Sequence, residues 1–134
     1  MSDAPPALPD FDTQYASLVK GPFLEQVERD RAGGADLLDR ARAYAERGKP
    51  EFVLAYLIGL SLDAAEKREL LAQAFERRAE ISERTAIALD AEHHRPFPLI
   101  GIEARKDRTM ARAVRAGKMI HPYARAAKPL NMHL

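Results

Sequence analysis

The sequence predicts an all-α protein of five or six helices in a compact orthogonal or bundle-like array, with extended N- and C-terminal arms. Alanine and leucine dominate and β-branched residues are sparse, which favours helices because unbranched side chains lose less rotamer freedom there. Apolar residues also recur at spacings of three and four along much of the chain, the period of one helix face. A length of 134 residues fits one domain with a single core.

The N-terminal region is predicted to lead from an arm into the helical domain. Residues 1–11 carry three prolines and are expected to form the extended arm, and the helical domain is expected to cover residues 12–117. A first short helix should begin near Asp12, whose side chain would cap it. A second should begin with Pro22 in its first turn and run to about Arg31, after which two glycines force a turn.

Two further helices are predicted in the middle of the chain. The first covers residues 35–47, and Gly48 supplies the left-handed conformation that commonly ends a helix. Residues 52–60 are apolar almost all round, a pattern that also fits a buried strand. We predict a helix there, because no other segment offers a strand partner.

The second half of the chain is predicted to hold the longest helix and a basic one. Ser61 would cap a long amphipathic helix over residues 62–92, which a Pro-Phe-Pro run ends. Residues 97–102 are expected to be an apolar connector, followed by a helix over 103–116. Residues 118–134 are interpreted as a basic tail, with a short helix docked on the domain or on a partner.

Residues 35–68 have the spacing of two tightly packed helices. A bulky residue, a small one, an aromatic, a turn glycine and a large residue in the second helix stand at Leu37, Ala41, Tyr44, Gly48 and Leu57. These positions resemble a single tetratricopeptide (TPR) helical hairpin, from which the chain departs at Arg40, Val53 and Ala65. The pattern covers about a quarter of the chain, whereas repeat folds normally need at least three units. The resemblance implies a docking surface for a protein or peptide and no chemistry.

Charge is divided unevenly along the chain. Residues 1–103 hold 19 acidic and 13 basic residues, a net charge of −6, whereas residues 104–134 hold one acidic and eight basic residues, a net charge of +7. The most compact basic group lies on one side of the predicted last helix, at Arg105, Arg108, Arg112 and Arg115, with Lys118 beyond it. The residues predicted to face inward are Met110, Ala113, Val114 and Gly117.

The arginine stripe has three interpretations. Arginines bind phosphate or carboxylate in a bidentate way, so the stripe fits nucleic acid, with salt-dependent binding. It also fits docking on an acidic surface, either of the chain's own N-terminal region or of a neighbouring subunit. A solvated charged face is the third interpretation.

A metal site is a weaker candidate. Asp90, His93 and His94 fall within one turn at the end of the long helix, and these are metal-ligand types. Bundle metal sites repeat such a motif on a second helix, which is absent here, and the helix dipole alone favours histidines in a last turn. We therefore expect no metal and no cofactor.

Several other function classes lack their sequence signals. The chain has no cysteine, no phosphate-binding glycine loop, no serine nucleophile elbow, no secretory signal and no membrane span. We accordingly expect a cytoplasmic protein that is not an enzyme. The leading hypothesis is a helical interaction module, a small subunit or adaptor with a protein partner or self-association. The second is a nucleic-acid-binding accessory protein, and the third a helical metal protein or enzyme.

Overall fold

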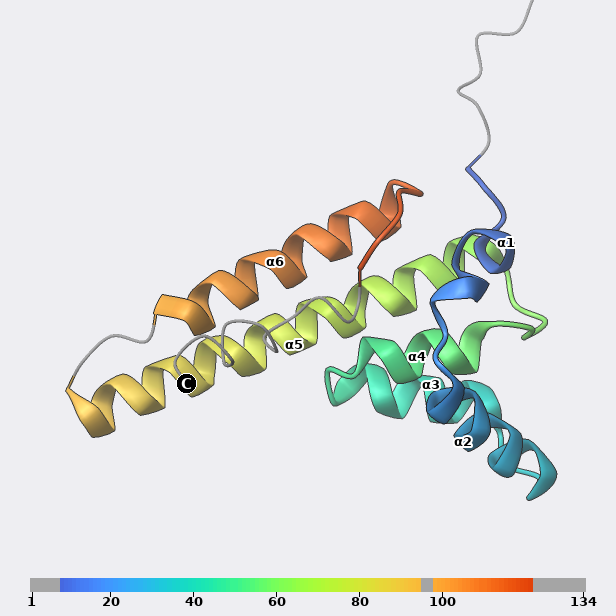
Figure 1. Ribbon diagram of the computed structural model, residues 1–134, viewed down its shortest axis with the longest axis horizontal. Coiled ribbons are helices and arrows are strands. Elements are labelled where there is room, and N and C mark those ends of the chain that lie inside the picture. Colours follow the sequence, from blue (N-terminus) through green and yellow to red (C-terminus); the bar gives the residue numbers. More distant parts are fainter. Residues whose placement is uncertain (1–7, 95–97, 122–134) are drawn as a thin grey trace, which may run out of the picture.

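The computed structural model describes residues 8–94 and 98–121 and confirms the all-α fold (Figure 1). In chain order the elements are α1 (Phe11–Tyr15), the 3₁₀ turn η1 (Ala16–Leu18), α2 (Gly21–Ala32), α3 (Leu37–Glu46), α4 (Pro50–Leu57), α5 (Ala64–His93) and α6 (Pro98–Arg115). Within the described ranges there is no β-strand. None of the helices there is both long and apolar enough to cross a membrane.

The long helix α5 is the axis of the molecule (Figure 1). The helix α6 runs back along it, and α1 to α4 gather around its N-terminal half. Among the described elements, α6 alone accompanies the C-terminal half of α5, so the two helices form an arm that extends from the α1–α4 body.

The core draws on all six helices and on residues at both ends of the described chain. Its largest fully buried side chains, each at most 1% exposed, are Tyr15, Tyr56, Phe11, Phe75, Leu54, Leu57, Leu71, Ile120, Val27, Val53 and Val114. Phe11 and Ile120 fall outside the domain limits of 12–117 that the sequence suggested. The Tyr15 hydroxyl also donates a hydrogen bond to the Lys118 carbonyl at 2.6 Å. The packed domain therefore includes both flanks, and the tail beyond His121 lies outside the described residues.

Two predicted helix caps are wrong. Asp10, not Asp12, caps α1, and its Oδ2 accepts from the Thr13 amide at 3.0 Å. Asp12 instead accepts hydrogen bonds from the Gly59 amide at 2.8 Å and from Lys67 Nζ at 2.9 Å. Ser61 does not cap α5, because the residues after α4 reverse the chain and the helix begins only at Ala64.

The sequence predicted which segments are helical more accurately than where each helix begins and ends. The apolar segment after Pro50 is the helix α4, but it ends at Leu57 because Ile58 is extended and Gly59 has a φ of +84°. The connector expected at 97–102 is wrong for the residues that the structure describes, since α6 begins at Pro98. Proline is tolerated in a first helical turn, where the amide that it lacks would be unpaired anyway.

Candidate interaction surfaces

The arginine stripe of α6 divides into two columns. Residues seven apart share a side of a helix, and Arg108 and Arg115 form the column next to α5. Arg115 binds Glu69 through Nε and Nη2 at 3.0 and 2.9 Å, and it binds Glu76 through Nη1 and Nη2 at 2.8 and 2.9 Å. Arg108 pairs with Glu83. An acidic column of α5 thus faces a basic column of α6. This is the arrangement expected if the stripe docks on an acidic surface of the same chain.

These contacts change the protonation equilibria of the groups involved. The hydrogen bonds from Arg115 hold the pKa of Glu69 and that of Glu76 below their usual range. The same bonds raise the pKa of Arg115. The three side chains are between 37% and 49% exposed, so solvent screens the attraction and limits what each pair contributes.

The second column, Arg105 and Arg112, points away from α5. Both residues are exposed, and neither has an ion pair with a residue that the structure describes; Arg112 donates to Thr109 Oγ1 at 3.2 Å. Lys118, just beyond the helix, is also exposed. Of the five predicted anion-binding residues, three are therefore exposed and have no ion pair with the residues that the structure describes.

The inward face of α6 matches the prediction and adds a residue that the sequence did not reveal. Val114 and Gly117 are buried, and Met110 and Ala113 are partly buried. Asp107 lies on the same face, 1% exposed, and accepts hydrogen bonds from Arg78 Nε at 3.1 and 3.2 Å and from Nη2 at 2.9 Å.

Arg78 links three helices. Its Nη1 also donates to Glu51 Oε2 of α4 at 3.0 Å, so a carboxylate–arginine–carboxylate triad joins α4, α5 and α6. The available signal was that Asp107 is the single acidic residue in a strongly basic segment.

A buried arginine, Arg68, ties the N-terminal segment to the end of α6. Arg68 is 3% exposed and donates to the Pro9 carbonyl at 2.5 Å, to Gln14 Oε1 at 3.1 Å and to the Tyr15 hydroxyl at 3.3 Å. It reaches the Val114 carbonyl at 3.4 Å. Its guanidinium is therefore used inside the protein and is not offered to a ligand.

The metal candidates do not converge. Asp90, His93 and His94 are exposed at the end of α5, and His94 is the left-handed C-cap with a φ of +56°. The described residues contain no group of three or more histidine, aspartate or glutamate side chains placed to hold one ion.

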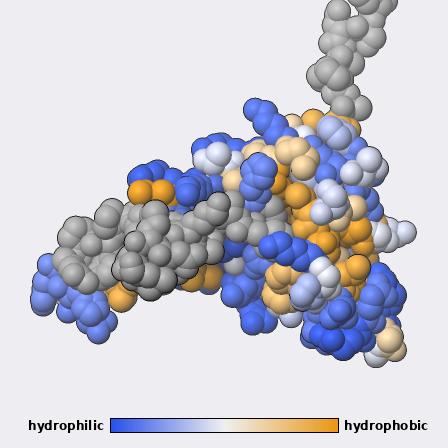
Figure 2. Space-filling view, viewed as in Figure 1, coloured by the Kyte–Doolittle hydropathy of each residue, from blue (hydrophilic) through white to orange (hydrophobic). Residues whose placement is uncertain are grey.

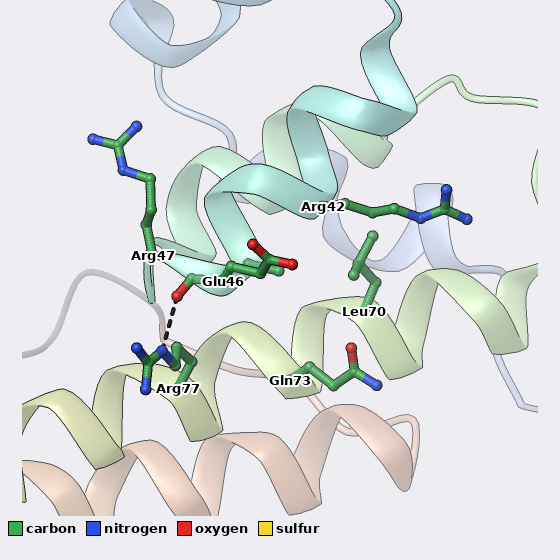
Figure 3. A pocket seen from close by; sticks show the side chains of 7 residues that line it. Arg42, Glu46, Arg47, Leu70, Gln73 and Arg77 are labelled. Carbon is green, nitrogen blue, oxygen red and sulfur yellow. Dashed lines mark hydrogen bonds between the residues drawn. The ribbon is translucent and has the colours of Figure 1, made fainter.

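A groove between α3 and α5 was not anticipated (Figure 3). Its larger hollow, of about 740 Å³, is lined by Arg42, Ala45, Glu46, Arg47, Leu70, Gln73 and Arg77. A neighbouring hollow of about 190 Å³ shares Arg42, Leu70 and Gln73 with it, and is completed by Leu38, Leu62, Glu66 and Glu69. The two hollows form one groove, which we call the α3–α5 groove. The single hint in the sequence was the docking surface implied by the TPR-like spacing.

The arginines of the α3–α5 groove differ in how they are used. Arg77 donates to the Glu46 carbonyl at 2.9 Å (Figure 3) and to Glu80 at 3.2 Å. The Arg47 guanidinium lies over the Tyr44 ring, 5.2 Å from its centroid. Neither Arg42 nor Arg47 has a carboxylate partner within the described ranges.

Apolar side chains are distributed unevenly over the surface. On the face seen in Figure 2 they gather at the end of the molecule formed by α1, α2 and α4, whereas the visible part of the α5–α6 arm is mainly hydrophilic. Isolated exposed apolar residues occur on both parts, Leu24 on α2 and Ile87 on α5 being 48% and 71% exposed. Single exposed apolar residues are normal in soluble proteins and carry no functional argument.

Comparison with known proteins gave no match to a family model, to a curated protein or to a solved structure. The TPR-like resemblance therefore stays a prediction. In this chain its residues form α3, a turn at Gly48, α4 and the first turn of α5. Any statement on function rests on the geometry of the chain itself.

Proposed function

We propose that this protein is a non-enzymatic helical interaction module, a small subunit or adaptor that binds another protein. The observation that carries the proposal is the α3–α5 groove. It combines a large hollow with apolar lining residues and with two arginines, Arg42 and Arg47, that lack a carboxylate partner among the described residues. Binding sites for proteins and peptides pair apolar contact area with a few charged groups that set orientation.

The proposal is tested by affinity capture from the native cell lysate, with and without nuclease, followed by mass spectrometry. We expect a stoichiometric protein partner that survives nuclease treatment. Sedimentation of the purified protein separates a heterologous partner from self-association. The absence of any nuclease-resistant protein partner, together with a monomer in sedimentation, would refute the proposal.

Binding to nucleic acid is the second candidate function, supported by the exposed column of Arg105 and Arg112. Residues seven apart on a helix are about 10.5 Å apart along its axis, so the two arginines can contact two separate phosphates. The other two arginines of the stripe already bind glutamates of α5.

This candidate makes a quantitative prediction about salt. Two phosphate contacts give a slope of about −2 for the logarithm of the binding constant against the logarithm of salt concentration, and four contacts a slope of about −4. Titration of a labelled DNA duplex at several salt concentrations measures the slope. No duplex binding at moderate salt, or binding unchanged in Arg105→Glu/Arg112→Glu, would remove nucleic acid as a partner of this surface.

A further inference from the structure

We infer that the α3–α5 groove binds a short amphipathic helix that carries carboxylates beside its apolar stripe. The inference rests on the proposed function, because it specifies the segment through which a protein partner would dock. Four properties of the groove carry it: its length, its apolar lining, the kind of backbone that lines it, and the distribution of charge along it.

The groove is long enough for several turns of helix. Its lining runs from Glu66 to Arg77 on α5, and the eleven steps between these residues rise about 17 Å along a helix. Leu38 and Arg42 of α3 flank the first part, and Arg42 with Arg47 flanks the second. A helical segment of about three turns matches that length.

The lining offers contacts for an apolar stripe. Leu38, Leu62 and Leu70 are partly exposed, and together with the buried Ala45 they contribute apolar surface to the two hollows. A partner helix with leucine, isoleucine or methionine at spacings of three and four would cover these side chains. Such i, i+3, i+4 anchors are the general mode of helix-in-groove recognition.

The backbone around the groove favours a helix over an extended peptide. Both walls are helices, α3 and α5, and interior helical amides and carbonyls are used within each helix. The groove therefore has no strand edge with which an extended peptide could pair. A helical partner satisfies its own backbone groups and needs only side-chain contacts.

The charges of the groove favour a partner that carries carboxylates. The larger hollow carries three arginines against the single Glu46, whereas the smaller hollow is completed by Glu66 and Glu69. Glu69 already binds Arg115. Arg42 lines both hollows and extends past Leu70, whereas Arg47 lies at the opposite side of the larger hollow (Figure 3). Neither arginine has an acidic partner in the described part of the chain, so carboxylates of the partner belong beside these two positions.

The test selects ligands from a displayed library of random peptides long enough for about four helical turns, with the full-length protein as bait. We expect enriched peptides with helix-forming residues, apolar residues at spacings of three and four, and aspartate or glutamate flanking the stripe. Affinity of a selected, labelled peptide is then measured by fluorescence anisotropy for the wild type and two variants. Arg42→Glu/Arg47→Glu should weaken binding at least about tenfold, because two attractive charges become repulsive.

The matched control is Arg105→Glu/Arg112→Glu, which changes the net charge equally on the exposed column of α6. It should leave peptide affinity within about twofold, and circular dichroism should show both variants folded, since all four arginines are exposed. No enriched peptide, enrichment of basic or extended peptides, or equal loss of affinity in both variants would overturn the inference.

The lysate capture separates failure of this inference from failure of the proposed function. A nuclease-resistant partner that binds Arg42→Glu/Arg47→Glu as well as it binds the wild type would keep the protein-binding function and refute the groove as its site. Absence of any such partner would refute both. A partner lost from this variant and retained by Arg105→Glu/Arg112→Glu supports both.

Discussion

Replacing Asp107 with alanine is expected to destabilise the protein by about 3 to 4 kcal/mol. The carboxylate is 1% exposed and receives three hydrogen-bond contacts of 2.9 to 3.2 Å from Arg78. The variant removes this carboxylate from the Arg78 guanidinium, whose side chain is 14% exposed. Loss of one partner from a buried ion pair costs about 3 to 5 kcal/mol, and the remaining 3.0 Å contact to Glu51 places the expected value in the lower half.

Urea unfolding followed by circular dichroism measures this change, and thermal melts give an independent estimate. For a chain of this length, 3 kcal/mol corresponds to a fall of roughly 10 °C in Tm. Asp90→Asn is the matched control, because that carboxylate is exposed and its loss should change the free energy of unfolding by less than about 0.5 kcal/mol. A loss below about 1 kcal/mol for Asp107→Ala would show that the triad is solvated or differently paired, and the reasoning would fail.

Three further predictions test the close packing of the Gly48 turn on α5, the docking of the C-terminal flank and the ion pairs between α5 and α6. Gly48→Ala should lower the free energy of unfolding in urea by about 2 to 4 kcal/mol, because φ is +68° and a Cβ would lie 2.9 Å from α5 backbone atoms. Gly34→Ala, where φ is +79° but a Cβ would meet open space, should lower it by about 1 to 2 kcal/mol. Ile120→Ala should cost about 2 to 4 kcal/mol, whereas Met119→Ala, at a side chain 51% exposed, should cost under about 0.5 kcal/mol; equal effects would contradict the docked C-terminal flank. Between about pH 5 and pH 3 the free energy of unfolding should fall less in Arg115→Met than in the wild type, the difference being below about 1 kcal/mol. In the wild type the lowered pKa of the two bound glutamates stabilises the fold above their unfolded pKa, and this stabilisation is lost on acidification.

Hydrophobic periodicity was sufficient to predict which segments are helices, but not where they end. A cap depends on which side chain is free to reach the backbone, and that is decided by tertiary contacts. The Asp12 side chain binds Lys67 and the Gly59 amide in the turn after α4, and not the backbone at the start of α1. Pro98 was interpreted as a terminator because proline cannot extend the hydrogen-bond ladder of the preceding helix, yet it opens α6, a position that suits proline equally well.

The same distinction holds for the candidate sites: features within one helix could be predicted from the sequence, and contacts between helices could not. The arginine stripe was visible because its spacing lies within one helix. Which arginines are occupied depends on the register between α5 and α6, and no local pattern specifies that register. The α3–α5 groove brings Arg42 and Arg77 together from segments 35 residues apart in the sequence. Spacing within either helix carries no information about this juxtaposition.

The uneven charge of the chain is partly balanced by ion pairs within the protein, and this changes where a partner is to be sought. The acidic column of α5 and one basic column of α6 neutralise each other across the arm. Exposed pairs of this kind add little stability, but they favour one register, because a shift of α6 by one turn would separate the charges. The basic C-terminal segment is therefore partly accounted for by the docking of α6. The arginines beside the α3–α5 groove come from the acidic part of the sequence, where the local excess of negative charge concealed them.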